Sequence, residues 1–387
     1  MNGPSFTSDT CIDVRNRPEA TCAFRLPSWP ATASTNGSAS SGPAAWTQDG
    51  RRPRDVSAYS VNWLTTSTGR ESSSADRFAL LGVQAAAARV DGWLGQGREI
   101  GEDKEMPAWI CATCAVQYPD TEEPPAHCPI CEDERQYVGW QGQRWTTARD
   151  LVRDHRSELR EEEPNLIGVG IEPAFGIGQR ALLVCTPQGN VLWDCVALID
   201  DAACRQILEL GGVDVICMSH PHFYGANIDI ADAFDARVLV PRADRDWIAR
   251  PSPRIELFDD EAEPIAGLTL ARIGGHFDGA AVLHWPAGAG QRGVLLTGDT
   301  ITVVQDRDWV SFMWSYPNLI PLDERTVLDI AARVERFSFD RVYGGWWGRV
   351  VVEDGARAIR RSAERYVARL RGERPSHATH GSPPSRT

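Results

Sequence analysis

Short apolar runs alternate with helical stretches through residues 165–370, and this alternation restricts the fold more than any other feature of the chain. The apolar runs are NLIGVGI, QRALLVCT, GNVLWDC, VDVICMS, RVLVP, LTLARIGG, AAVLHWP, GVLLTGD and RVYGG. Helical spacing lies between them near 200–210, 228–234 and 323–337, and a last helix ends near Leu370. Strands that lead into helices predict a mixed α/β domain over residues 165–372, with sheets layered between helices.

Four of the ten cysteines form two C-x-x-C pairs, Cys111 with Cys114 and Cys128 with Cys131, with thirteen residues between the pairs. This spacing is typical of two turns whose thiolates close a tetrahedron around one metal ion. The predicted module, residues 106–137, is polar and has too little apolar core to be stable without a metal. Zinc in a structural ribbon is the expected ion, although a rubredoxin-like iron site uses the same ligands, and free or disulfide-bonded cysteines are the other alternative.

The segments outside these two parts have different compositions. Residues 1–105 are rich in Ser, Thr, Gly, Ala and Pro, which predicts a largely disordered segment. The purine-rich codons needed for Glu-Asp-Lys-Glu, just before Met106, raise a second hypothesis, that Met106 is the initiator and residues 1–105 are not translated. Helical spacing predicts a connecting helix over residues 138–164, and we expect the Ser- and Pro-rich tail, residues 373–387, to be disordered.

Charge and hydropathy restrict the partners of the chain. A formal net charge of -13 argues against a nucleic-acid-binding protein, which needs a basic stripe. The sequence has no apolar run near the roughly 18 residues of a membrane helix, and no basic segment followed by an apolar one at its start. We therefore expect a cytoplasmic protein that acts on a small molecule, without nucleic-acid or membrane partners.

Three histidines and an aspartate follow one another in three segments of the main domain. His220 and His222 lie in SHPHFYG, His276 lies in GGHFDGAAVLHW, and Asp299 lies in LLTGDT. In this order the segments resemble the metallo-β-lactamase fold superfamily, whose first motif is H-x-H-x-D-H. The resemblance covers about residues 166–370. It implies an αββα sandwich in which the three histidines bind a metal ion and Asp299 is available as a fourth ligand.

The same segments depart from the superfamily at the ligands of its second metal ion. Tyr224 and Gly225 stand where D-H would, and YGGWWGRVV stands where a late histidine would. We therefore expect one ion, zinc or iron, at the histidine site. Tyr224 has an ordinary pKa of about 10, so we expect it to donate a hydrogen bond to a developing oxyanion rather than act as a base. Asp194, which ends GNVLWDC, resembles an aspartate that supports the site without binding the metal.

Aromatic residues crowd the presumed mouth of the site, and Phe223, Trp346 and Trp347 are the expected pocket residues. Three imidazoles with an open coordination position would hold zinc and lower the pKa of a bound water to about 7, which supplies hydroxide at neutral pH. The expected function is therefore a mononuclear metallo-hydrolase that acts on a small ester, thioester, lactone or amide, with Asp299 and Tyr224 as catalytic residues.

Two other functions stay open on the sequence. His220 or His222, with His276 and Asp299, would also form a two-histidine, one-carboxylate iron site, as in the related persulfide dioxygenases, and a rubredoxin-like module would fit such an oxidoreductase. The missing second-metal ligands also fit a non-catalytic binding protein with a degenerate site. The acidic balance disfavours the nuclease branch of the superfamily.

Overall fold

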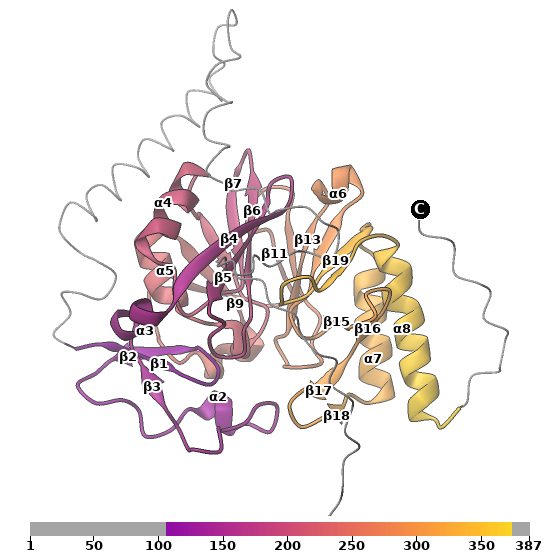
Figure 1. Ribbon diagram of the computed structural model, residues 1–387. Helices are drawn as coiled ribbons and strands as arrows, with labels where there is room; N and C mark the ends of the chain where they lie inside the picture. The colour runs from indigo at the N-terminus through magenta and orange to yellow at the C-terminus, as the bar shows by residue number, and fades with distance from the viewer. Residues whose placement is uncertain (1–105, 374–387) are drawn as a thin grey trace, which may run out of the picture. The chain divides into compact units, whose positions relative to one another are not determined.

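The structure is a computed structural model that describes residues 106–373 of the chain. The predictions for residues 1–105 and for the tail after Glu373 lie outside the described residues. In the described part, two sheets pack face to face and helices cover their outer faces (Figure 1). The predicted αββα sandwich is confirmed.

The first sheet has seven strands in the order β10-β9-β8-β7-β6-β5-β4. Strands β4 to β7 pair antiparallel, and β7 to β10 pair parallel because helices connect them. The strands are β4 Arg156–Glu163, β5 Leu166–Glu172, β6 Ala181–Thr186, β7 Gly189–Trp193, β8 Val215–Cys217, β9 Arg237–Pro241 and β10 Ile255–Phe258. The helical segments are α4 Asp201–Glu209, the 3-10 helix η2 Pro221–Phe223, α5 Asn227–Phe234 and the 3-10 helix η3 Arg242–Trp247.

The second sheet has six strands in the order β11-β12-β13-β14-β19-β20, and only β14 and β19 pair parallel. Its strands are β11 Glu261–Ala262, β12 Thr269–Arg272, β13 Ala281–Trp285, β14 Val294–Leu296, β19 Arg341–Tyr343 and β20 Val350–Val351. The helices are α6 Gly288–Gln291, α7 Glu324–Glu335 and α8 Gly355–Leu370. Two short hairpins follow β14, formed by β15 Thr302–Val303 with β16 Val310–Ser311 and by β17 Met313–Ser315 with β18 Ile320–Pro321.

Alternating side chains on the central strands build three apolar layers. Leu182 in β6 and Leu283 in β13 both lie in the layer between the sheets. Their neighbours point the other way, Leu183 into the layer shared with α4 and α5, and Val282 into the layer shared with α7 and α8. A period of two with both faces buried is the reason these runs read as continuously apolar in the sequence.

The four-cysteine module is a three-stranded sheet in the order β2-β1-β3 with one short helix. Its elements are β1 Ala108–Cys111, β2 Gln117–Asp120, α2 Pro129–Glu132 and β3 Trp145–Thr146. The connecting helix predicted over residues 138–164 is wrong in extent, because only α3, Ala148–Asp154, is helical there. The charged run that follows forms the edge strand β4, where charges discourage pairing with another chain and resemble the polar face of a helix.

The module is anchored on the first sheet by polar contacts. The Gln117 backbone N–H donates to the Gly225 carbonyl at 3.0 Å. Arg250, whose side chain is 10% exposed, pairs with Asp229 in α5 at 2.8 Å and with Asp120 in β2 at 3.3 Å. A cation between two carboxylates therefore joins the module to the main domain.

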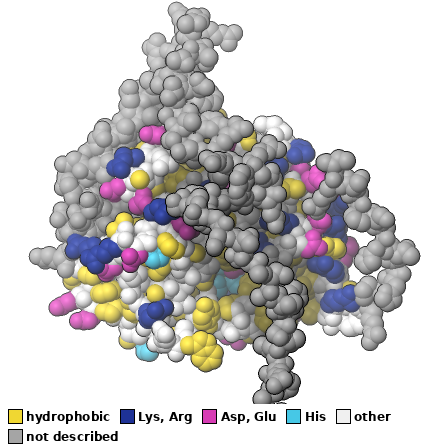
Figure 2. Space-filling model, viewed as in Figure 1, with side chains coloured by type: hydrophobic (Ala, Val, Ile, Leu, Met, Phe, Trp, Pro, Cys, Tyr) yellow, Lys and Arg dark blue, Asp and Glu magenta, His cyan; other side chains and the backbone are white. Residues whose placement is uncertain are grey.

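The described surface carries charges of both signs. Figure 2 shows basic and acidic side chains interspersed on one face of the described residues. Within residues 106–373, no helix is both long and apolar enough to cross a membrane.

Truncation of Leu283, which is fully buried between the sheets, is expected to lower the free energy of unfolding by about 2–5 kcal/mol, because Leu283→Ala leaves a cavity in a layer closed on both sides. Leu328→Ala is the matched control, since Leu328 is 43% exposed on α7 and its loss should cost less than about 0.5 kcal/mol. Urea unfolding at one fixed zinc concentration measures both. Equal losses in the two variants would contradict the layered core.

Candidate metal centre

Loops from both sheets bring the predicted histidines and aspartate to one place. His220 and His222 follow β8 of the first sheet, on either side of the first residue of η2. His276 lies in the turn that precedes β13, and Asp299 lies in the turn that begins two residues after β14; both strands belong to the second sheet. Residues that are far apart in the sequence therefore converge where the sheets face each other.

The close approach of two of these loops depends on a glycine. Gly298 has a φ of +54°, and a Cβ at this position would lie 2.6 Å from the Ser219 Oγ atom. The Ser219 carbonyl also accepts a hydrogen bond from the Ala281 N–H at 2.9 Å. A larger side chain at residue 298 would separate His220 from Asp299.

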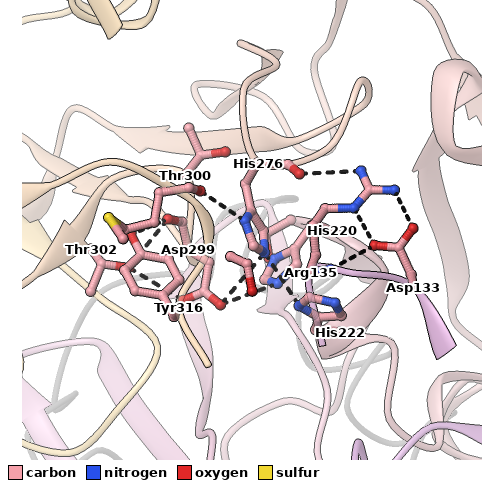
Figure 3. Close-up of polar contacts among 12 residues, drawn as sticks. Asp133, Arg135, His220, His222, His276, Asp299, Thr300, Thr302 and Tyr316 are labelled. Atoms are coloured by element: carbon pink, nitrogen blue, oxygen red, sulfur yellow. Dashed lines mark hydrogen bonds and ion pairs between the residues drawn. The ribbon is translucent and has the colours of Figure 1, made fainter. Parts of the chain in front are cut away.

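The four donor groups face one another (Figure 3). His276 Nε2 lies 3.2 Å from His222 Nδ1, and Asp299 Oδ2 lies 3.5 Å from His220 Nε2 and 3.9 Å from His276 Nε2. One donor atom from each of the four residues lies within 4.8 Å of all the others, and all four side chains are buried. The structure thus brings together all four predicted ligands of this site.

Contacts on the far side of the donors fix their orientation. His220 Nδ1 is hydrogen-bonded to Ser219 Oγ at 2.9 Å, and His276 Nδ1 donates to the Met313 carbonyl at 3.1 Å. Thr302 Oγ1 donates to Asp299 Oδ1 at 3.3 Å. These contacts leave both Nε2 atoms and Oδ2 directed toward the centre, as is usual for imidazole and carboxylate ligands of metals.

The chemistry of the cluster fits one divalent cation. Burial holds the pKa of His222 well below its ordinary value and lowers that of His276 to about 4, so these imidazoles are neutral near pH 7, which is the form that binds metal. His220 Nε2 is buried and has no hydrogen-bond partner among residues 106–373. Three imidazoles and one carboxylate are a ligand set for zinc or ferrous iron.

Asp194 supports the first loop, in agreement with the role implied by the resemblance. Its Oδ1 accepts a hydrogen bond from the Ser219 N–H at 2.8 Å. Complete burial raises its pKa to about 8. The residue therefore holds the backbone next to His220 and is not one of the four clustered donors.

Two other residues at the site were not among the predicted site residues. The Tyr316 hydroxyl donates to the Asp299 carbonyl at 2.8 Å. Arg135, from the four-cysteine module, donates through Nη1 to the His276 carbonyl at 3.3 Å. Both contact backbone oxygens of ligand residues, and such contacts leave no spacing signal in a sequence.

Of the predicted pocket residues, Phe223 lies beside the site and Trp346 packs against Phe223. The Phe223 ring is 4.5 Å from the His220 ring and 5.5 Å from the Trp346 ring, measured between centroids. Trp346 Nε1 donates to the Ile177 carbonyl at 2.9 Å, which fixes the indole. Their role as substrate-pocket residues stays a prediction.

Trp347 packs against the first sheet. A Cβ at Gly168 or Gly170 of β5 would overlap its indole, with closest atoms at 2.4 Å and 2.8 Å. The guanidinium carbons of Arg160 and Arg180 lie 4.4 Å and 5.6 Å from its ring. These contacts are those of a packed indole, so we give Trp347 a structural role.

Tyr224, the predicted oxyanion donor, is buried next to the site. Its hydroxyl has no hydrogen-bond partner among the described residues, and burial raises its pKa well above 10. The phenol is therefore neutral and keeps its proton to donate. Its catalytic role stays a prediction.

The four cysteines form a second cluster. Their sulfur atoms all lie within 4.8 Å of one another, with Cys111 and Cys131 3.6 Å apart and Cys114 and Cys128 3.7 Å apart. A tetrahedron with metal–sulfur bonds of about 2.3 Å has edges of about 3.8 Å, so these separations fit four thiolates around one ion. All four cysteines are free of disulfides.

Hydrogen bonds to sulfur support this second site. The Tyr118 hydroxyl donates to Cys128 Sγ, and Gln143 Nε2 donates to Cys111 Sγ, both at 3.2 Å. Donors directed at sulfur favour the thiolate form, which is the form that binds metal. The geometry therefore fits the predicted four-thiolate site, while the identity of the ion stays a prediction.

A buried carboxyl anchors the turn that carries His276. Asp244 Oδ1 accepts a hydrogen bond from the Gly279 N–H at 2.7 Å, and a Cβ at Gly279 would lie 2.4 Å from the Asp244 Cγ atom. Burial raises the pKa of Asp244 to about 7, and nearby Asp278 adds to the increase. The turn is thus held by a carboxyl group that titrates near neutral pH.

The fold and the two clusters define an α/β protein with a metallo-β-lactamase-like sandwich and two groups of metal-ligating residues. No protein-family model matches the sequence. The chain is 46% identical over 271 residues to the uncharacterized protein YmaE of Bacillus subtilis (strain 168), across 69% of this chain and 98% of that protein. It belongs to the same family as YmaE.

Solved structures with a similar arrangement are remote in sequence. A structure of VMB-1 at pH 5.5 is 14% identical with a TM-score of 0.43, covering 56% of this chain and 98% of that one. A B3 metallo-β-lactamase with an active-site glutamic acid is 18% identical with a TM-score of 0.37, covering 56% of this chain and 91% of that one. The fold assignment rests on the two sheets and their helices described above.

The two clusters are expected to load separately. Purified wild-type protein should contain one metal equivalent at each, and His220→Ala should lose the ion of the histidine site while the ion of the cysteine site remains. Cys111→Ser should lose the cysteine-site ion, because three thiolates hold zinc more weakly than four. Elemental analysis after dialysis measures both. Full metal content in His220→Ala would rule out the histidine cluster as a metal site.

The anchor of the His276 turn predicts a pH dependence. Because the folded pKa of Asp244, about 7, lies above the ordinary 3.8, the folded protein retains a proton that the unfolded chain has released between these values. Protonated Asp244 therefore adds to the free energy of unfolding, and this contribution is complete below about pH 4 and is lost as pH rises toward 7. Asp244→Asn should remove this pH dependence. The free energy of unfolding of the variant minus that of wild type should therefore rise by on the order of 2 kcal/mol between pH 4.5 and pH 8. Denaturant unfolding at matched metal concentrations measures the slope, and parallel curves would contradict it.

Proposed function

We propose that the protein is a mononuclear metal-dependent hydrolase that acts on a small ester, thioester, lactone or amide. The observation that carries this proposal is the convergence of three buried imidazoles and one carboxylate at a single point between the sheets, where outer contacts orient His220, His276 and Asp299. When bound there, a divalent ion supplies Lewis-acid chemistry, which activates water and polarises a carbonyl group.

The residues of the chain contribute orientation and a defined proton position. Asp299 has Oδ1 engaged by Thr302 and its carbonyl engaged by Tyr316, so Oδ2 alone is left to ligate or to accept a proton from water. The neutral phenol of Tyr224 is proposed to donate to an oxyanion. Phe223 packs beside His220 and Trp346 packs against Phe223, and this apolar surrounding is proposed to favour an uncharged substrate and to keep water from the donors.

An iron oxidoreductase is the second candidate function. The observation in its favour is the donor set itself, because two imidazoles and one carboxylate with open positions also suit ferrous iron and oxygen chemistry. The nature of the loaded metal distinguishes the two functions, so each metal form has to be assayed separately.

The expected result is hydrolysis of at least one chromogenic ester, thioester, lactone or amide by the zinc-loaded protein, and loss of at least about 100-fold in kcat/KM in His276→Ala and Asp299→Ala. The loss should exceed the 10–100-fold typical of outer contacts because ligands themselves are removed. His284→Gln is the matched control, since His284 is buried in β13, bonded to the Ser338 carbonyl at 2.8 Å and outside the cluster.

Two outcomes would reject the hydrolase. Unchanged turnover in His276→Ala would assign the activity to another site or to a contaminant. Turnover of a sulfur substrate with oxygen by the iron-loaded protein, without hydrolysis by either metal form, would favour the oxidoreductase.

A further inference from the structure

The segment that follows the last cysteine of the module forms a tight turn. The Asp133 N–H donates to the Pro129 carbonyl at 3.1 Å, which closes the short helix α2. The Asp133 carboxylate then accepts from the Arg135 N–H at 2.9 Å, and the Asp133 carbonyl accepts from the Gln136 N–H at 3.0 Å. The second metal-binding turn of the module therefore continues directly into a rigid turn that presents Arg135.

The Arg135 side chain is clamped by its own turn and directed at the histidine site (Figure 3). Its Nε and Nη2 atoms donate to the two carboxylate oxygens of Asp133 at 2.6 Å and 2.9 Å. Its Nη1 donates to the His276 carbonyl at 3.3 Å. Only 8% of the residue is exposed, and burying a charged group costs free energy. This buried guanidinium contacts the backbone of a proposed ligand.

Aromatic rings hold the guanidinium on its faces. Its central carbon lies 3.7 Å from the Phe277 ring centroid and 4.5 Å from that of Trp314. The Phe277 ring in turn packs against all three histidine rings, at centroid distances of 5.0 Å to His222, 5.2 Å to His276 and 5.8 Å to His220. Arg135 therefore contacts the backbone of one ligand and the ring on which all three imidazoles rest.

The same turn also holds the strand that orients His276. Glu134 Oε1 accepts from Trp314 Nε1 at 2.9 Å, and Asn318 Nδ2 donates to the Glu134 carbonyl at 2.8 Å. Trp314 belongs to β17, whose first residue, Met313, accepts the hydrogen bond of His276 Nδ1. The turn after the cysteines thus secures His276 both directly and through β17.

We propose that Arg135 is a positioning residue of the histidine metal site, and that the four-cysteine module acts as a part of this site by presenting it. The inference rests on the proposed metal site and adds a role for the module beyond its own fold. Arginine is required because a lysine cannot pair with both Asp133 oxygens, stack between two rings and reach the His276 carbonyl at once.

The test measures metal binding, which does not require a known substrate. Wild type, Arg135→Ala and Arg135→Lys are dialysed against a series of buffered free-zinc concentrations and analysed for metal. Arg135→Ala should keep the cysteine-site ion and bind the second ion about 10–100-fold more weakly, as expected when a contact that orients ligands is lost. Arg135→Lys should lie between Arg135→Ala and wild type, and it carries the test if the alanine variant fails to fold.

A spectroscopic readout separates positioning from general loosening of the fold. The cobalt spectrum of each protein, minus that of the same protein with His220→Ala added, isolates the histidine site. Arg341→Ala is the matched control, because Arg341 is a partly buried arginine of β19 that pairs with Glu163 of β4 and does not belong to the module. The Arg135 variants should shift the difference spectrum, whereas that of Arg341→Ala should match wild type.

Wild-type zinc affinity and an unshifted cobalt spectrum in both Arg135 variants would overturn the inference, as would an equal loss in Arg341→Ala. These outcomes are independent of the proposed reaction. A protein that hydrolyses substrates but tolerates both Arg135 variants refutes the positioning role alone. A protein that shows the expected zinc and cobalt effects but hydrolyses nothing refutes the hydrolase alone.

Discussion

Three buried imidazoles and a carboxylate share a space between two sheets, and this cluster is the constraint on which the other features depend. Buried polar atoms without partners destabilise a fold by roughly 1–3 kcal/mol each, so a cluster of donors with converging lone pairs is unfavourable unless a cation accepts them. A bound ion would join the loops after β8 and β14, which belong to different sheets. Metal binding and the packing of the sandwich are therefore expected to stabilise each other.

The parts of this arrangement that the sequence predicted are those with a regular spacing. The two C-x-x-C pairs predicted a cluster of four cysteines, because two residues between cysteines fit one turn of backbone. In the structure the four sulfur atoms do converge. The apolar runs determined the strands, since strands buried on both faces contain few polar residues. His220, His222, His276 and Asp299 were predicted from the resemblance of their segments to the metallo-β-lactamase fold superfamily. Each of these segments adjoins an apolar run, and strand ends place the four side chains at one edge.

The features that the sequence did not predict depend on contacts between distant residues. Arg135 and His276 are separated by 141 positions, and they meet through a backbone carbonyl, which any residue carries. The segment of β4 has a helix-like charge pattern because, as an edge strand, it needs no regular apolar face. Trp347 packs on glycines of β5, and the space above a glycine cannot be recognised before the neighbouring strand is placed.

The position of Arg135, just after Asp133 and the last cysteine of the module, lowers the free-energy cost of burying its side chain. Immobilising an arginine side chain loses about 2 kcal/mol of rotamer entropy, and removing its charge from water costs more. Asp133 lies only two residues before Arg135, so their pairing forms within the module and does not depend on the main domain. The module therefore presents a guanidinium that is already ordered and neutralised, and docking requires only that its exposed face meet Phe277, Trp314 and the His276 carbonyl. An ion bound by the four cysteines directly before this turn would provide the rigidity that such presentation needs, which is a physical reason for the two clusters to occur in one chain.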